Sequence, residues 1–152
     1  MYQFFVEPEQ IQDKRITITG KDVNHIRNVL RMKPGEEIAV SNGIDGREYR
    51  CGIETITEEE VICTLRFIKE EGVELPARIY LFQGLPKADK MELIVQKSVE
   101  LGVYEVIPVA ARRCVVRLDD KKAAAKVSRW QGIAEAAAKQ SRRGIILDVH
   151  PV

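Results

Sequence analysis

The sequence is poor in the residues that usually bind metals. Its 152 residues include three cysteines and two histidines, and none of them stands at the spacing of a zinc site. An odd number of widely separated cysteines does not predict a disulfide framework, so Cys51, Cys63 and Cys114 are expected to be free thiols in a reducing compartment. Neither histidine lies in a motif that would activate a cysteine. We therefore expect no metal site and no cysteine nucleophile.

Long apolar runs are missing as well. No stretch approaches the ~18 apolar residues of a membrane-spanning helix, and residues 1–6 lack the basic and then apolar pattern of a signal peptide. The sequence therefore predicts no membrane partner and a cytoplasmic location. Phosphate-binding glycine loops of the GxGxxG and Walker types and the HExxH zinc motif are also absent. With 45% hydrophobic and 31% charged residues, the composition is that of an ordinary globular protein.

The small net charge of +1 conceals two segments of opposite sign. Residues 112–152 contain ten lysines and arginines against four acidic residues, which gives +6, whereas residues 54–74 contain seven glutamates against two basic residues, which gives −5. A positive region can meet an anionic partner such as nucleic acid, although most charged surfaces are only solvated. Charge alone leaves both interpretations open.

The first seventy or so residues are typical of a small β-barrel or sandwich with one helix. Apolar alternation predicts five strands, and the spacing of Val23, Ile26 and Leu30 predicts a helix over residues 23–31. The predicted strands are residues 2–6, 15–19, 37–41, 47–56 and 61–68. Residues 69–76 are charged and contain glycine and proline, so we place a boundary there, between domains 1–72 and 73–152.

The second domain has the alternating pattern of a parallel α/β layer. Its strands are expected at residues 78–83, 105–109 and from 145 onward, and its helices at residues 89–101 and 119–141. Strand 78–83 is almost wholly apolar, which predicts helices on both faces of the sheet. Asp89 and Glu92 fit a capping box, and Gly102 and Gly144 fit helix ends.

Basic and polar side chains follow the strands and the long helix of this domain. They are Lys87 and Lys90 after the first strand, Arg112 and Arg113 after the second, and Gln140, Arg142 and Arg143 at the helix end. Arginine binds phosphate through two hydrogen bonds and lysine as a point charge, so we expect these groups to converge on one sheet edge as an anion site. Two plainer explanations stay open, that the lysines are solvated and that the arginines favour the helix C-terminus. Glu100 is either a surface residue or a buried partner of one of these arginines.

A second basic group lies in the first domain. His25, Arg27, Arg31 and Lys33 stand on or beside the polar side of the predicted helix. Such a face on a β-scaffold can hold an RNA backbone, or it can be an ordinary solvated surface. The residues alone thus indicate a two-domain α/β protein with a candidate anion-binding or RNA-binding edge.

Four blocks of sequence, taken in order, resemble one known family. They are His25-Ile26-Arg27-Asn28-Val29-Leu30-Arg31 with Pro34-Gly35; Leu85-Pro86-Lys87 through Met91-Glu92, with Gln96-Lys97 and Glu100-Leu101-Gly102-Val103; Arg113-Cys114-Val115-Val116; and Arg129-Trp130 with Ile133-Ala134, Ala137 and Gln140-Ser141-Arg142-Arg143. Together they are similar to the bacterial 16S ribosomal RNA uridine-N3 methyltransferases. The block from Leu85 to Val103 is the most specific of the four.

The resemblance implies a fold and a reaction. The fold would be a PUA-like β-barrel that binds RNA, followed by the first part of a parallel, Rossmann-like α/β domain of the SPOUT type. The reaction would transfer a methyl group from S-adenosylmethionine to N3 of a uridine in 16S rRNA of the small ribosomal subunit, in a homodimeric enzyme. By the same resemblance, Glu100, Arg113, Gln140 and Arg143 would be catalytic, on the substrate side of the cleft. The expected RNA contacts are His25, Arg27, Arg31, Lys33, Lys87, Lys90, Arg112 and Arg142.

Three departures from the family pattern stand out. Gln3 occupies a position that is often arginine, and Arg112 one that is often acidic. The family also continues with a glycine-rich GPEGG segment and an LG-RILR-ETA segment, which form the knot that binds S-adenosylmethionine, and neither segment is present here. The resemblance therefore implies an N-terminal portion of the enzyme with no cofactor-binding residues of its own and no activity by itself.

Two other kinds of function stay open. The chain could be a self-sufficient RNA-binding module whose α/β half serves only for dimerisation, which would show salt-dependent RNA affinity and no response to the cofactor. It could instead be an α/β regulator that binds a small molecule, which would be stabilised by its ligand and show no affinity for RNA.

Overall fold

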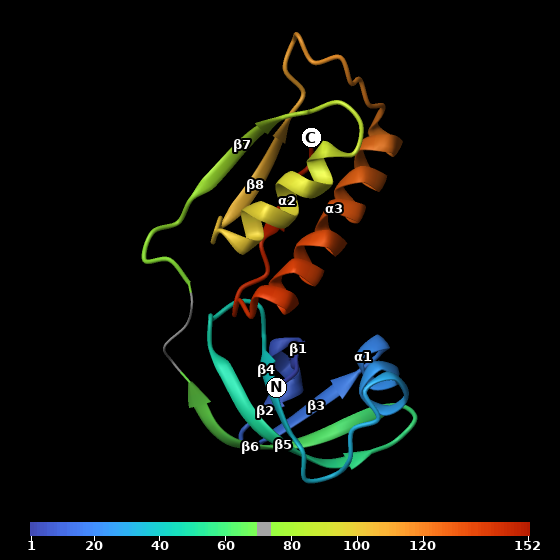
Figure 1. The fold of residues 1–152 in the computed structure, drawn as a ribbon, viewed down its shortest axis with the longest axis vertical. Helices are drawn as coiled ribbons and strands as arrows, with labels where there is room; N and C mark the ends of the chain where they lie inside the picture. Colours follow the sequence, from blue (N-terminus) through green and yellow to red (C-terminus); the bar gives the residue numbers. More distant parts are fainter. Residues whose placement is uncertain (70–73) are drawn as a thin grey trace. The chain divides into compact units, whose positions relative to one another are not determined.

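The computed structural model describes residues 1–69 and 74–152, and the chain divides into two compact units, Met1–Val73 and Glu74–Val152 (Figure 1). Each unit has a sheet of its own. The predicted boundary between residues 72 and 73 lies outside the described residues. Within the described ranges, no helix is long and apolar enough to cross a membrane.

The first unit is a six-stranded, strongly bent sheet in the order β1-β4-β5-β6-β3-β2 (Figure 1). Its strands are β1 (Gln3–Phe5), β2 (Ile11–Gln12), β3 (Arg15–Thr19), β4 (Glu37–Ser41), β5 (Glu48–Ile56) and β6 (Glu60–Lys69). The β1–β4 pair is parallel, and every other pair in this sheet is antiparallel. The five strands predicted for this half are found, and β2 is an additional short one.

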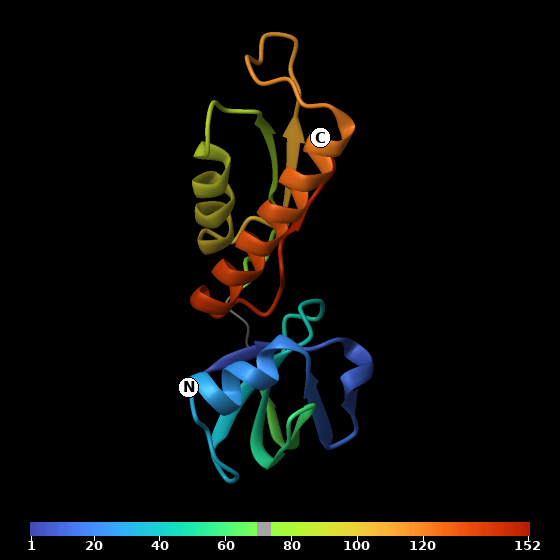
Figure 2. The same cartoon turned by 90° about the vertical axis from the view of Figure 1, so that its right-hand side faces the viewer.

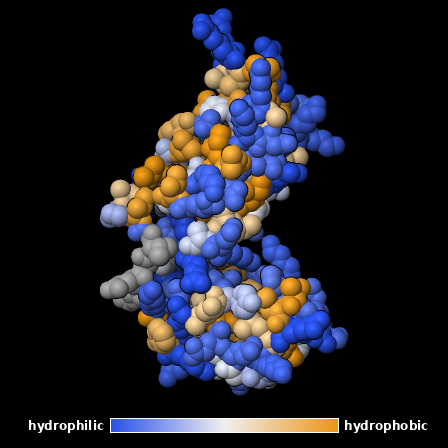
Figure 3. All heavy atoms as spheres, viewed as in Figure 1, coloured by the Kyte–Doolittle hydropathy of each residue, from blue (hydrophilic) through white to orange (hydrophobic). Residues whose placement is uncertain are grey.

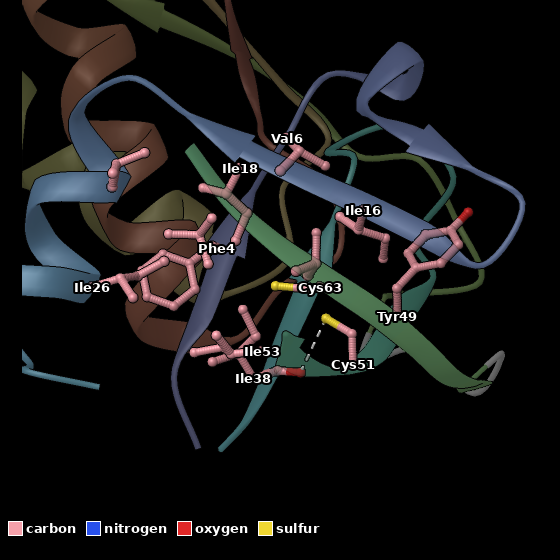
Figure 4. Packing of buried hydrophobic residues seen from close by; sticks show 13 residues of the cluster. Phe4, Val6, Ile16, Ile18, Ile26, Ile38, Tyr49, Cys51, Ile53 and Cys63 are labelled. Carbon is pink, nitrogen blue, oxygen red and sulfur yellow. Dashed lines mark hydrogen bonds between the residues drawn. The ribbon is translucent and has the colours of Figure 1, made fainter. Parts of the chain in front are cut away.

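Alternating side chains of these strands fill one core. The buried set is Phe4, Val6, Ile16, Ile18, Val23, Ile26, Ile38, Val40, Tyr49, Cys51, Ile53, Val61 and Cys63 (Figure 4). The Cys51 thiol lies beside Cys63 and donates to the carbonyl oxygen of Ile38 at 3.6 Å. Its hydrogen bond with Cys63, together with burial, raises the pKa of the Cys51 thiol. Both thiols are free and inaccessible, so they pack as small apolar groups.

The helical segment of this unit differs from the predicted single α-helix over 23–31. It begins as α1 (Lys21–Asn24) and continues as a wider π-helical turn, η2 (His25–Val29); a short 3-10 turn, η1 (Pro8–Gln10), precedes it in the chain. The N–H of Leu30 donates to His25 O at 2.8 Å, a spacing of five residues. The helix ends early because Arg31 adopts φ +53° and the N–H of Met32 turns back to Ile26 O. Ile26 still packs in the core, as predicted.

The second unit is a parallel sheet in the order β7-β8-β9, with two helices (Figure 2). Its elements are β7 (Tyr80–Gly84), α2 (Lys90–Glu100), β8 (Glu105–Val109), α3 (Asp120–Ser141) and β9 (Asp148–Val149). Strands in sequential order joined by right-handed crossovers place both helices on the same face. Val106 and Val149 are buried on that face, whereas Tyr80 and Phe82 of the opposite face are 47% and 71% exposed. The prediction of helices on both faces is therefore wrong for the described residues.

The ends of the two helices only partly follow the predictions. Asp119 caps α3, and its side chain accepts from the N–H of Lys122 at 2.8 Å. The predicted capping box at Asp89 is wrong, because the Asp89 side chain makes no capping hydrogen bond and Glu92 instead binds Arg129 of α3 at 2.6 Å. That hydrogen bond raises the pKa of Arg129.

The start of β9 also differs from the sequence pattern. Helix α3 ends at Ser141, as predicted, but the residue that closes it in the left-handed region is Arg142, at φ +58°, instead of Gly144. Strand β9 begins at Asp148 rather than at Ile145. The N–H of Ile145 donates to the carboxylate of Glu74 at 3.3 Å. The backbone of Ile145 therefore makes a tertiary contact and does not pair with β8.

Candidate nucleic-acid interface

Four exposed cations follow the carboxyl ends of β7 and β8. Lys87 and Lys90 come after β7, and Arg112 and Arg113 come after β8. The N–H of Leu85 donates to Val109 O at 3.1 Å, which ties the two strand ends together. The structure thus brings these four predicted residues to the same sheet edge, which we name the carboxyl edge.

Arg112 and Arg113 occupy the tip of a turn. The N–H of Cys114 donates to Ala111 O at 2.9 Å, which closes a four-residue turn with the two arginines in its centre. Strongly hydrophilic side chains cover the tip of the connection between β8 and α3 (Figure 3). Two guanidinium groups at an exposed turn can bind phosphate oxygens without any cost of desolvating a buried charge.

The loop after β7 holds a strained residue. Ala88 has φ +54°, a conformation that costs a non-glycine residue about 1 kcal/mol or more. It lies between Lys87 and Asp89, and the backbone on both sides is held by the Leu85–Val109 bond and by the N–H of Glu92, which donates to Asp89 O at 3.0 Å. Such strain persists where the surrounding structure imposes it, and it is common at ligand sites.

The remaining predicted residues of this unit lie at the opposite end of the sheet. Glu100 closes α2, and Gln140, Arg142 and Arg143 close α3 or follow it. In a parallel α/β layer the helices run back against the strands, so their last residues lie at the amino ends of the strands. Figure 1 shows the end of α3 and the β8–α3 connection at opposite ends of this unit. The prediction that all these groups converge on one edge is therefore wrong within a single chain.

Arg143 is buried and fully engaged at this amino edge. Its guanidinium is 4% exposed and binds the Glu74 carboxylate through both Nε and Nη2, at 3.1 and 2.6 Å. Its Nη1 donates to the carbonyl oxygens of Val99 and Val103 at 3.2 and 2.8 Å. One side chain therefore joins the end of α2, the end of α3 and the first described residue of this unit.

The other amino-edge residues are exposed. The Glu100 carboxylate binds Lys97 at 2.6 Å, one turn earlier on α2, so the alternative of a buried partner for an arginine is wrong. Arg142 and Gln140 lie on the surface at the end of α3. Arg113 is thus the one member of the predicted catalytic set that the structure places at the carboxyl edge.

The four predicted residues of the first unit share one exposed surface segment. Arg27 binds Glu58 at 3.2 Å, a contact between two exposed side chains that contributes little stability and that an RNA phosphate can replace. The ring of His25 meets the ring of Phe4 edge to face, with 6.2 Å between centroids. Arg31 and Lys33 are exposed beyond the helical turn. All four are therefore available to a partner.

Sequence reasoning missed a hollow at the carboxyl edge. It has a volume of about 170 Å³ and is lined by the loop after β7, by Val116 and Leu118, and by Lys126 and Trp130 of α3. Lys126 and Trp130 stand four residues apart, so they share one side of the helix. The spacing could have been noticed, but nothing in the sequence showed that this side meets the loop after β7.

The size of the hollow at the carboxyl edge limits the ligands that it can hold. Ligand pockets usually measure ~300–1,000 Å³, and the hollow there is smaller. A larger hollow of about 670 Å³ runs along α3 beside Val149, Pro151 and Val152, but it flanks a helix instead of opening beyond the strand ends. Across residues 1–69 and 74–152, no group of three or more His, Cys, Asp or Glu side chains is placed to hold a metal ion.

Two domain families match the chain. An RNA methyltransferase domain matches residues 73–152, which is more than half of the chain, and an RNA methyltransferase PUA domain matches residues 18–66. Both matches agree with the two units of the structure. They confirm the predicted family and the predicted fold class, a PUA-like β-barrel unit followed by a parallel α/β unit.

Individual relatives extend the match over nearly the whole chain. Ribosomal RNA small subunit methyltransferase E of Bacillus subtilis is 42% identical, over 99% of this chain and 60% of that protein. The Aquifex aeolicus protein of the same name is 30% identical, over 93% of this chain and 59% of its own length. The crystal structure of the Neisseria gonorrhoeae protein, bound to S-adenosyl methionine, superposes with a TM-score of 0.84 at 33% identity, over 99% of this chain and 62% of that one. The chain spans about three fifths of the length of these relatives.

Proposed function

We propose that this chain is the RNA-recognising portion of an enzyme that methylates the RNA of the small ribosomal subunit. The chain belongs to the RNA methyltransferase family. The observation that carries the proposal is the 42% identity to a small-subunit rRNA methyltransferase over 99% of the chain. The exposed cations at the carboxyl edge and on the first unit supply the charge that an RNA backbone requires.

The finer proposal is that the methyl group goes to N3 of a uridine and comes from S-adenosylmethionine. A uridine N3 must lose its proton before it can attack a methyl group, and the negative charge then spreads over N3 and the neighbouring carbonyl oxygens. Arg113 at the carboxyl edge is the member of the predicted catalytic set that could stabilise that charge, because a guanidinium donates hydrogen bonds to anionic oxygen and nitrogen atoms. Since we assign no residue of this chain to the cofactor, we derive no step through it.

The roles of the other residues follow from their positions. Lys87, Lys90 and Arg112 would hold phosphates beside the target nucleotide, while Arg27, Arg31 and Lys33, with His25, would hold RNA on the first unit. Arg142 would add a phosphate contact at the amino edge. Arg143, buried against Glu74, would act by positioning the ends of α2 and α3.

A homodimer is part of the proposal. Glu100 and Gln140 lie at the amino edge and Arg113 at the carboxyl edge of the same sheet. These groups can serve one substrate only if two copies of the chain contribute to it. We place the dimer in the cytoplasm, where ribosomal subunits assemble.

We further propose that this chain binds RNA but does not methylate it alone. The test is binding of a short 16S rRNA hairpin at low and moderate salt, with radiolabelled S-adenosylmethionine present. We expect affinity that falls steeply with salt, and Arg112→Glu should weaken binding and lower the slope of log K against log salt by about 1. Lys14→Glu, on the exposed turn before β3, is the matched control and should change little.

Each outcome decides between the candidate functions. Methyl transfer by the chain alone would contradict the proposed inactivity. Salt-dependent binding that Arg112→Glu leaves unchanged would favour an RNA-binding module whose α/β unit only dimerises. Absence of RNA binding, with stabilisation by a small molecule instead, would favour the regulator.

A further inference from the structure

The first unit has a hollow of its own, at the end of the sheet where the parallel strands β1 and β4 begin. It has a volume of about 460 Å³, within the ~300–1,000 Å³ range of ligand pockets. Three segments line it, namely the residues before β1, the residues after η2 and the start of β4: Met1, Tyr2, Leu30, Met32, Glu36 and Glu37. We name it the first-unit hollow. It is large enough for one nucleoside.

The walls of the first-unit hollow are tied to the rest of the unit. Leu30 and Met32 pack against the buried core. The N–H of Met32 donates to Ile26 O at 3.0 Å, and the N–H of Ala39 on β4 donates to Tyr2 O at 2.9 Å. Side chains that are held by the core and by backbone hydrogen bonds keep their positions in the absence of a ligand. The hollow is therefore preformed.

The apolar part of the lining suits a flat aromatic ring. Tyr2 contributes a phenol ring that is 53% exposed. Met1 and Met32 contribute thioether sulfurs, which are polarisable and pack well against aromatic rings. An exposed aromatic side chain on a unit that binds RNA is a surface on which an unstacked base can stack.

Two cations stand beside the hollow. Arg31 and Lys33 are exposed and precede and follow Met32, which lines the hollow. Arg31 adopts a left-handed φ of +53°, and such strain persists where the surrounding structure imposes it, often at ligand sites. The two side chains can therefore hold the phosphates on either side of a base that enters the hollow.

The polar part of the lining consists of two carboxylates. Glu36 accepts from the N–H of Lys33 at 3.0 Å through Oε2, and Glu37 accepts from Arg66 through Oε1. An ionised carboxylate only accepts hydrogen bonds, and each of its two oxygens can accept, so a ligand of this hollow must donate. Guanine has two neighbouring donors on one edge, N1–H and the exocyclic amino group. Adenine and cytosine have an amino group beside a ring-nitrogen acceptor, and uracil has a single N–H between two carbonyl oxygens.

We propose that the first-unit hollow binds one unstacked guanine of the RNA, a nucleotide other than the one that is methylated. The inference rests on the proposed function and deepens it, because it gives the first unit a preference for a particular base. The guanine ring stacks on Tyr2, and its N1–H and amino group donate to the carboxylates of Glu36 and Glu37. Arg31 and Lys33 bind the neighbouring phosphates.

The test uses the whole chain of 152 residues and a short single-stranded RNA of uridines that carries a fluorescent dye at one end. The central nucleotide is guanosine, inosine, adenosine or an abasic ribose. Because the flanking uridines are the same in every strand, a difference in affinity comes from the central base. Fluorescence anisotropy should show the guanosine strand binding about tenfold more tightly than the abasic strand, as expected for one stacked base. Inosine, which lacks only the amino group, and adenosine should both bind more weakly than guanosine.

Matched variants separate the first-unit hollow from general RNA binding. Tyr2→Ala should abolish the preference for guanosine and keep the salt-dependent affinity for the abasic strand. Tyr80→Ala removes a ring that is 47% exposed on the second unit, and it should keep the preference. Glu36→Gln should bring the guanosine strand close to the inosine strand, whereas Glu59→Gln, at an exposed carboxylate of the same unit, should change neither affinity.

The outcomes distinguish this inference from the proposed function. Equal, salt-dependent affinities for the guanosine and abasic strands would overturn the guanine site and leave the proposed function standing. A preference for guanosine that survives Tyr2→Ala would also overturn it. Free guanosine monophosphate, which lacks the neighbouring phosphates, should compete only weakly, and binding as tight as that of the strand would refute the assignment to RNA. If no strand binds, both the inference and the proposed function fall.

Discussion

The guanidinium of Arg143 makes several hydrogen bonds within the second unit. It binds both oxygens of Glu74 and two backbone carbonyl oxygens, and Glu74 in turn accepts from the N–H of Ile145. A buried ion pair stabilises a fold less than its short distances suggest, because both charges lose their hydration. Removing one partner is different, since it leaves the other charge buried and unpaired.

Arg143→Met should therefore lower the free energy of unfolding of the second unit by about 3 kcal/mol or more. Chemical denaturation followed through Trp130 emission measures this unit directly. Arg142→Met is the control, because Arg142 is exposed at the neighbouring position and should change stability by less than about 0.5 kcal/mol. Equal losses in the two variants would contradict the role assigned to Arg143.

At the scale of the element, the turn between β4 and β5 is held by side chains in place of a regular hairpin. Asn42 Oδ1 accepts from the N–H groups of Ile44 and Asp45, and Asp45 accepts from the N–H of Arg47 and from the Tyr49 hydroxyl at 2.8 and 2.7 Å. Partial burial alone would raise the pKa of Asp45, but the hydrogen bonds from Tyr49, Arg47 and Asn42 outweigh it and lower that pKa below 3.8. Burial, together with the hydrogen bond to Asp45 and the negative charge of that carboxylate, raises the pKa of Tyr49.

This turn gives the first unit a pH dependence at the acidic end. Because the Asp45 carboxyl has a lower pKa in the folded than in the unfolded chain, its stabilising effect is present above the ordinary pKa of 3.8 and is lost as pH falls through the folded value. Asp45→Asn should cost less than about 1 kcal/mol at neutral pH, because solvent screens this exposed carboxylate, and should flatten the loss of stability below pH ~4. Glu59→Gln, which removes an exposed carboxylate of the same unit, should keep the wild-type profile. The free energy of unfolding of both variants, measured at several pH values across the acidic range, tests this. Equal pH profiles for the two variants would contradict the role of Asp45.

At the scale of the whole molecule, the second unit leaves one sheet face and the β7 edge of the sheet open. Tyr80 and Phe82 project from the face that no helix of the described residues covers, and β7 is an edge strand of its sheet. Exposed aromatic side chains beside unpaired backbone groups favour association between copies.

We expect the chain to associate as its concentration rises, and Phe82→Thr to shift association to higher concentration. Sedimentation or light scattering over a range of concentrations measures the effect. Phe67→Thr is the matched control, since Phe67 is 59% exposed on β6 of the other unit and lies outside this face. A wild-type chain that stays monomeric at every concentration, or an equal effect of both substitutions, would contradict the expectation.

How much could be read from the sequence differs between these scales. The strands at Arg15–Thr19, Glu37–Ser41 and Glu105–Val109 were predictable to the residue, because apolar alternation and turn residues are local signals. The start of β9 was not, because it depends on the contact between Ile145 and Glu74, which are 71 residues apart. The failed cap at Asp89 has the same origin, since Glu92 is drawn to Arg129 of another helix.

The candidate site shows a similar division. Lys87, Lys90, Arg112 and Arg113 could be placed together, because they follow parallel strands. The grouping of Gln140, Arg142 and Arg143 with these cations was wrong. The three residues lie at the end of α3, which runs back against the strands and therefore ends at the amino edge of the sheet. The hollow beneath the cations could not be predicted, since its walls come from segments that meet only in the folded chain.

Cys114 allows the carboxyl edge to be labelled chemically at one defined position. It is the only one of the three thiols that is not buried, and it stands at the base of the turn that carries Arg112 and Arg113. A maleimide dye should therefore attach there alone and leave Cys51 and Cys63 untouched in the core. The single indole of Trp130 can serve as the energy donor for that dye. Energy transfer from Trp130 to the dye then reports any movement of the β8–α3 connection on RNA binding, without a change in the sequence.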